Sequence, residues 1–208
     1  MAYPTVSAPY GFKPINRQDG MPYAGATSQY VIKSVSTAIY NGDLVYLGAG
    51  GVVKSTVTTT SEITVANQAN LTAGVFVGCQ YVNTQGQTVQ AQYYPGNAAA
   101  SSAIAYVVVD DKAAYKVAVT DGSDVMSSTT INAIGVNLAV DQGTGSTTTG
   151  DSANGVVAPS SNGNASTLPV KVIGVVPETA INATNFAEVI VVLNNPQLTS
   201  AAGGVNFS

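Results

Sequence analysis

The chain has 208 residues, of which 45% are hydrophobic and only 9% are charged, and its net charge is −4. Its 7 Lys and Arg residues are scattered, which argues against a nucleic-acid interface, because such interfaces need clustered cations that release counterions. The absence of histidine excludes Ser-His and Cys-His nucleophile pairs and any histidine ligand to a metal. A surface so poor in charge suits a protein that packs against partners.

The first segment, residues 1–28, is predicted to be an extended N-terminal arm without a strand or core residue. Prolines at positions 4, 9, 14 and 22 fix φ and remove hydrogen-bond donors. Ordering the backbone costs about 1–2 kcal/mol per residue, and burying one large side chain returns about 1.5–3 kcal/mol. We therefore expect the arm to be ordered only when docked. Docking onto another subunit is the favoured interpretation, and packing on its own domain is the alternative.

The β domain is predicted over residues 29–195, beginning with strands at 30–35, 44–47 and 52–57. The glycine cluster at 48–51 lacks the Lys-Ser/Thr of a phosphate-binding loop and is interpreted as a hairpin turn. Two antiparallel hairpins should follow, because apolar residues alternate with polar ones on either side of short turns. One hairpin joins Val75–Val82 to Thr88–Tyr94, and the other joins Ile104–Val109 to Ala114–Val119.

The second half of the domain contains the one predicted helix, at Ser128–Ala133, followed by an extended segment. Residues 143–166 form a low-complexity Gly/Ser/Thr stretch, interpreted as a long surface loop with one short strand at Val156–Val157. Nearly continuous Val and Ile predict buried strands at Pro169–Val176 and Ala187–Leu193. Residues 196–208 are predicted to be a flexible tail. The fold class is thus all-β, an antiparallel β-sandwich or barrel with an extended N-terminal arm and at most one short helix.

Candidate catalytic groups do not converge anywhere in the sequence. Asp110 and Asp111 are adjacent, and neighbouring side chains in a strand or turn diverge, so they do not form a glycosidase pair. We therefore expect no enzyme activity, no cofactor, no metal and no small-molecule substrate. The lone Cys79 is interpreted as a buried apolar residue. No stretch approaches the roughly 18 apolar residues of a membrane helix, and the N-terminus lacks signal-peptide features, so we expect neither a membrane partner nor secretion.

A series of short motifs carries a family resemblance. These are APYGFKPI at Ala8–Ile15, GDLVYL at Gly42–Leu47, GVFVGCQYVN at Gly74–Asn83, QYYPGN at Gln92–Asn97, AYVVVDD at Ala105–Asp111, STTTGDS at Ser146–Ser152 and KVIGVV at Lys171–Val176. In order and spacing the chain resembles a family of tailed-bacteriophage virion structural proteins. It is similar to the capsid decoration, or cement, proteins of marine and freshwater podoviruses and related phages.

This resemblance implies a protein made in the host cytoplasm and located on the capsid surface of the virion. It would bind the outer surface of the shell of major capsid protein as a homotrimer and stabilise the head. Another virion component, a tail or head-fibre subunit, is the alternative. Contacts to capsid or subunit are predicted for the aromatic and apolar residues of the arm and the Tyr-rich hairpin, because Tyr and Phe are favoured at interfaces. These residues are Tyr10, Phe12, Pro14, Ile15, Tyr23, Tyr93 and Tyr94.

Overall fold

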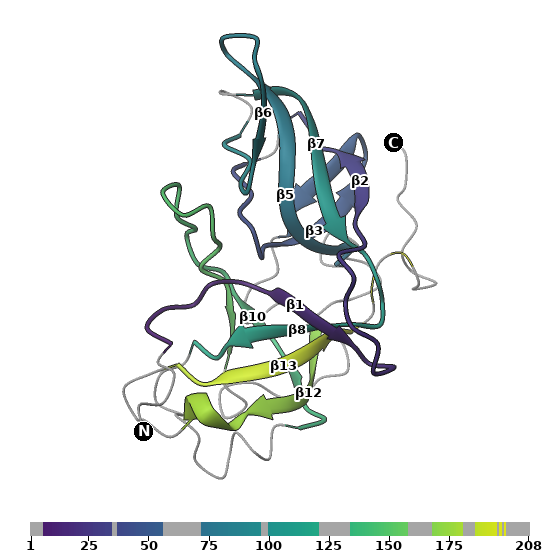
Figure 1. Ribbon diagram of the computed structural model, residues 1–208, viewed down its shortest axis with the longest axis vertical. Helices are drawn as coiled ribbons and strands as arrows, with labels where there is room; N and C mark the ends of the chain where they lie inside the picture. The colour runs from purple at the N-terminus through teal and green to yellow at the C-terminus, as the bar shows by residue number, and fades with distance from the viewer. Residues whose placement is uncertain are drawn as a thin grey trace.

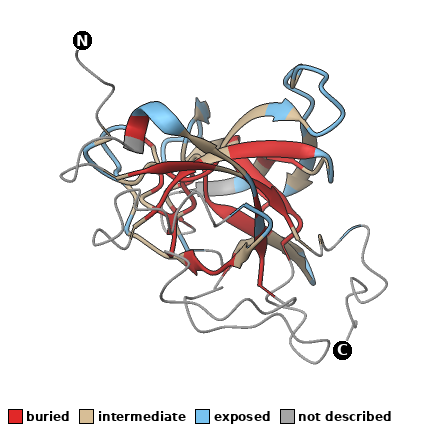
Figure 2. Ribbon diagram, turned by 90° about the horizontal axis from the view of Figure 1, so that it is seen from below, coloured by how far each residue is buried: buried red, intermediate tan, exposed pale blue. Residues whose placement is uncertain are grey.

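A computed structural model describes residues 6–34, 37–55, 72–96, 100–120, 134–157, 168–180, 186–194, 196 and 198. This part of the chain is all-β and predominantly antiparallel, as predicted, and its one helical element is the 3-10 turn η3 (Pro177–Ala180). The strands form two groups at opposite ends of the long axis (Figure 1). Buried residues follow the strands of both groups, and exposed residues lie at turns and on η3 (Figure 2).

The first group is a closed ring of five strands, here called the first barrel. Its strand order is β2 (Ser28–Val31), β7 (Ala100–Val108), β5 (Gly74–Asn83), β3 (Leu44–Gly48) and β4 (Gly51–Lys54). A parallel bridge between Ile32 and Val52 joins the last strand back to the first, so the ring has no open seam at this point. The additional strand β6 (Thr88–Ala91) pairs with β5 and extends that sheet.

The second group, the second barrel, is closed in the same way. Its strands are β8 (Ala113–Ala118), β13 (Glu188–Leu193), β12 (Val170–Val176), β9 (Asn137–Leu138), which continues as β10 (Val140–Asp141), and β11 (Gly155–Val156). A parallel bridge between Val119 and Val156 returns the ring to β8. One further strand, β1 (Lys13–Arg17), pairs with β8 outside the ring.

The two barrels have the same topology. In chain order, the five strands are β2, β3, β4, β5 and β7 in the first barrel, and β8, β9–β10, β11, β12 and β13 in the second. In each barrel the first strand pairs with the fifth, the fifth with the fourth, the fourth with the second and the second with the third, all antiparallel. In each, the third strand closes on the first in parallel. Both fourth strands carry a β-bulge beside a glycine, between Phe76 and Gly78 in β5 and between Val172 and Gly174 in β12. The chain is therefore an internal structural repeat.

Individual main-chain hydrogen bonds repeat as well. Gly42 N donates to Phe76 O at 2.8 Å, and in the second barrel Gly135 N donates to Val172 O at 2.8 Å. Both glycines have positive φ, at 96° and 90°, a conformation that side chains rarely adopt. Three further N–H to O=C hydrogen bonds of the first barrel have an equivalent in the second. Phe76 donates to Asp43 as Val172 donates to Val136, and Ile32 donates to Ala103 as Val119 donates to Ala187. Lys33 donates to Val52 as Thr120 donates to Val156.

The parallel closure requires a glycine in each third strand. A Cβ placed on Gly51 would lie 2.3 Å from Val31 O, and one placed on Gly155 would lie 2.9 Å from Ala118 O. Val31 and Ala118 occupy equivalent positions in the two first strands. Both barrels thus depend on the same close main-chain approach.

The first predicted hairpin is confirmed, because β5 and β6 pair from Cys79–Ala91 to Val82–Thr88. The second predicted hairpin is wrong. Strands β7 and β8 belong to different barrels, and the turn between them carries the chain from one barrel to the other. The turn chemistry was identified correctly, but short-range signals do not say in which sheet the next strand pairs. The helix predicted at 128–133 lies outside the described residues.

The expectation that residues 1–28 contain no strand and no core residue is also wrong. Strand β1 lies within this range, and Phe12 just before it is fully buried in the core of the second barrel. Pro14 is accommodated because β1 is an edge strand, where a missing N–H can face away from the sheet. Residues 11–17 therefore pack on the chain's own second barrel.

Replacement of Gly51 by alanine should destabilise the first barrel by at least about 2 kcal/mol, since the new Cβ would collide with main-chain atoms at a strained φ of 135°. Gly174→Ala is the matched control, because its nearest neighbours lie 3.6 Å or more from an added Cβ, and it should cost less than about 1 kcal/mol. Denaturant unfolding of both variants measures the difference. Equal effects would contradict the closure described above.

Candidate interaction surface

The predicted contact residues divide between the two barrels. Phe12 is fully buried, with its ring 6.5 Å from that of Tyr115 in an edge-to-face arrangement. Tyr10 is half-buried, and its hydroxyl donates to Glu188 of β13. Lys116 Nζ lies 5.8 Å from the centre of the Tyr10 ring and 3.1 Å from Glu188 Oε1. Both aromatic side chains thus fasten the N-terminal segment to the second barrel.

Three other predicted residues, in β1 or close to it, remain partly exposed. Pro14 lies opposite Tyr115 in the β1–β8 pair, and Ile15 occupies the bulge that follows it. Tyr23 packs against the core of the second barrel, and its hydroxyl donates a hydrogen bond to Ala26 O at 3.0 Å. Burial, with a further contribution from the Asp110 charge, raises the pKa of Tyr23. This is the part of the predicted set that can touch a partner at the second barrel.

The tyrosine pair of the first barrel is divided between core and surface. Tyr94 is buried in the core of the first barrel. Its N–H donates to Ile39 O at 2.7 Å, and its C=O accepts from Ile39 N at 3.0 Å. Tyr93 is half-exposed, and its ring stacks on that of Tyr40 with centroids 5.6 Å apart. Phe12 and Tyr94 are therefore inaccessible to a partner in this conformation, whereas Tyr93 is accessible in part.

A segment that we call the strap, residues 142–154, connects the two barrels. It joins β10 to β11 in the second barrel, at the place where residues 49–50 make a tight turn in the first. Gly145 of the strap lies so close to Tyr40 that an added Cβ would be 2.3 Å from the ring. Gly150 also lies close to the first barrel, since an added Cβ would be 3.0 Å from the Gln92 side chain. The strap therefore packs on the first barrel beside the Tyr40–Tyr93 stack.

The strap is held by a buried carboxylate, Asp43, which is fully shielded from solvent. Asp43 Oδ1 accepts hydrogen bonds from Ser152 Oγ at 2.6 Å and from Asn154 Nδ2 at 3.0 Å, both from the strap. Asp43 Oδ2 accepts from Tyr40 N at 2.9 Å and lies 3.1 Å from Lys54 Nζ. The carboxylate thus connects two strap residues, its own turn and β4. Three hydrogen bonds and an ion pair together compensate the buried negative charge, which would otherwise be strongly destabilising.

A second, more exposed contact supports the same strap. Lys13 Nζ lies 2.6 Å from Asp151 Oδ1 and also donates to Asn41 Oδ1 at 3.1 Å. Because the Lys13 and Asp151 side chains are 31% and 39% exposed, this ion pair is worth less than about 1 kcal/mol. It links β1, the strap and the first barrel at one point.

The sequence indicated no convergence of carboxylates, and it predicted residues 143–166 as a surface loop. The strap contains too little apolar area to predict burial, and its buried polar side chains are those of Ser152 and Asn154, residue types that are common in exposed loops. The one available signal was the Asn-Gly-Asp turn at 41–43, which places a carboxylate next to a strand.

The outer face of the β6-β5-β7-β2 sheet was also missed. Cross-strand partners share a face, so the pairing registers place two rows of side chains on it. Val31 is 61% exposed, and the residues that these registers place on the face are all uncharged. We call it the uncharged face. Its first row is Val31, Ile104, Gln80 and Gln90, and its second row is Gln29, Tyr106 and Gly78.

No family model, curated protein or solved structure matches the chain. The described residues contain no group of three or more His, Cys, Asp or Glu side chains placed to hold a metal ion. In the same part of the chain, no helix has the length and apolar character needed to cross a membrane.

Replacing Asp43 with alanine should lower the free energy of unfolding by about 3–5 kcal/mol, because Lys54 and the two strap side chains would lose their buried partner. Asp151→Asn removes a carboxylate from the exposed ion pair of the same strap and should cost less than about 1 kcal/mol. Limited proteolysis should cut the strap of D43A first. A strap that stays resistant in D43A would show that Asp43 does not anchor it.

Stability should also fall at high pH through Tyr10. Burial, the hydrogen bond to Glu188 and the Glu188 charge all raise the pKa of Tyr10. The folded chain therefore holds the phenolic proton more tightly than the unfolded chain. This contribution to stability is complete below the unfolded pKa of about 10 and is lost as the pH rises above it. Tyr10→Phe should lose less stability than the wild type between about pH 8 and pH 11, measured by denaturant midpoints.

Proposed function

We propose that this protein is a bacteriophage capsid decoration protein that binds the outer surface of the major capsid protein shell and stabilises the head. The observation that carries the proposal is the uncharged face, because interface cores are depleted in charge while Tyr and long apolar side chains are enriched there. A protein that acts by adding contact area needs such a face and a rigid body to present it. The series of virion-protein motifs in the sequence supports the same assignment.

The two-barrel body suits this role mechanically. The strap and β1 join the barrels through buried and half-buried contacts, so that force applied to one barrel is passed to the other. Many copies of a modest interface give strong total attachment when symmetry holds them in place. We propose a homotrimer at a threefold or quasi-threefold junction of capsid proteins, with the uncharged face and the exposed parts of Pro14, Ile15, Tyr23 and Tyr93 as contacts.

Cryo-electron microscopy of purified particles, averaged with icosahedral symmetry, tests the assignment. The expected result is ordered density for this chain in many copies on the outer shell, clustered in threes. Density confined to the tail or to a head fibre would assign the protein to those structures and would refute the decoration role.

A variant pair tests the uncharged face. Val31→Lys places a charge on the face, and roughly tenfold or greater loss of binding to undecorated particles is expected, because the ammonium group would be buried without a partner. Ile134→Lys is the matched control, since Ile134 is 55% exposed, belongs to the second barrel just before β9 and is not among the proposed contacts. Co-sedimentation with particles measures both, and equal binding of the two variants would remove the face from the interface.

A further inference from the structure

The repeat reveals a difference between the two barrels at the edge of the first strand. In the second barrel, β1 covers the β8 edge over residues 113–116, ahead of the parallel bridge at Val119. Matching Ile32 to Val119 makes residues 26–29 the counterpart of this edge in the first barrel. Within the described ranges, β7 and the bridge at Ile32 are the pairings of β2, so no strand covers residues 26–29 on the side away from β7.

The main-chain groups at this edge point outward. Ile32 N donates to Ala103 O, toward β7, whereas Lys33 N donates to Val52 O on the opposite side. Since the direction alternates along a strand, the N–H and C=O groups of Thr27 and Gln29 point away from β7, like those of Lys33. Both residues are exposed, and no backbone partner for these groups occurs among the residues that the structure describes. In the second barrel the equivalent residues, Ala114 and Lys116, pair with β1.

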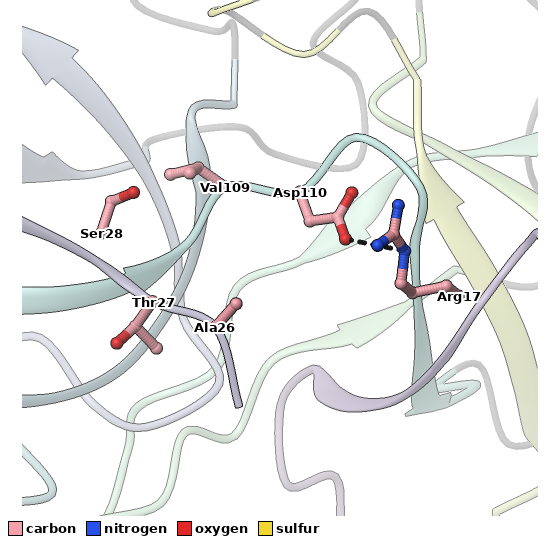
Figure 3. A pocket seen from close by; sticks show the side chains of 6 residues that line it. All are labelled: Arg17, Ala26, Thr27, Ser28, Val109 and Asp110. Carbon is pink, nitrogen blue, oxygen red and sulfur yellow. Dashed lines mark ion pairs between the residues drawn. The ribbon is translucent and has the colours of Figure 1, made fainter. Parts of the chain in front are cut away.

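A hollow lies beside the same edge (Figure 3). Its volume is about 280 Å³, enough for one large side chain. In the second barrel, Phe12 enters with β1 and packs against Tyr115, and the counterpart of Tyr115 is the much smaller Ser28. The hollow is lined by Ala26, Thr27, Ser28, Val109, Asp110 and Arg17.

We propose that residues 26–29 form a strand-acceptor edge, which binds an extended segment of a partner protein antiparallel to β2 and takes one aromatic or large apolar side chain into the hollow. The chemistry of the occupant is given by β1, which covers the equivalent edge with a short strand and a preceding phenylalanine. Among the described residues, β1 is the strand with this chemistry, and it is already paired with β8, so we assign the edge to a segment of another protein. This inference is independent of the capsid assignment.

The probe is a peptide with the sequence of residues 8–17, APYGFKPINR, added to the ¹⁵N-labelled full chain. Its addition should shift and protect the amides of Thr27 and Gln29 in a saturable way, with a dissociation constant of about 1 mM or lower. A peptide N-methylated at the position of Lys13, which pairs with Lys116 in the β1–β8 ladder, should lose this effect. Thr27→Pro removes an edge N–H and should also abolish binding, whereas Thr27→Val retains the N–H and should bind.

The methylated peptide keeps the test decisive if T27P does not fold. No shift at Thr27 and Gln29 at several millimolar peptide, or shifts centred elsewhere, would overturn the proposal. Protection of the same two amides on raising the protein concentration without peptide would show that a second copy occupies the edge, and would overturn the assignment to a different partner.

Discussion

Each barrel depends on one parallel contact, between the end of its first strand and its third strand. All other neighbouring strands of the rings are antiparallel, and each ring would remain an open sheet without this contact. Open edges expose unpaired main-chain groups, and this closure satisfies the N–H groups of Lys33 and Thr120, which donate to Val52 O and Val156 O. The approach is so close that only a glycine fits, which explains why Gly51 and Gly155 occupy the same place in sequences that otherwise differ.

The buried Asp43 carboxylate adds a constraint of another kind. Replacing a buried ion pair by apolar groups often leaves stability unchanged, so such a pair is better understood as a device that selects one arrangement. Here the arrangement is that of the strap on the first barrel, because Ser152 and Asn154 must both reach the same oxygen atom. The strap adds to other contacts between the two barrels, which are also joined by the short connection from β7 to β8 and by a buried cluster that Leu44, Val75 and Val108 share with the second barrel.

The sequence predicted most strands because their signal is local. Alternation and turn residues identify the β5–β6 hairpin without reference to the rest of the chain. The β7–β8 connection has equally good turn chemistry, but the pairing partners of β8 are β1 and β13, which are distant in sequence. Phe12 was predicted to lie in an arm because the four prolines of residues 1–28 argue against a strand. An edge strand such as β1 tolerates proline, however, and carries Phe12 into the core. The uncharged face was missed because it appears only when the registers of four strands are combined.

The repeat also shows which features are common to two rings built from different side chains. The matched positions of the two barrels share the bulges and the hydrogen-bond pairs, together with three glycines at 42 and 135, 51 and 155, and 78 and 174. Most of their side chains differ, and the intervening loops differ in length. The two barrels therefore share main-chain geometry without sharing side chains, because each ring is held by main-chain hydrogen bonds and by the close approach at Gly51 and Gly155. The two rings differ in what adjoins them: the second barrel carries the covering strand β1, and the first carries the additional β5–β6 hairpin, so the same ring can present different edges to its surroundings.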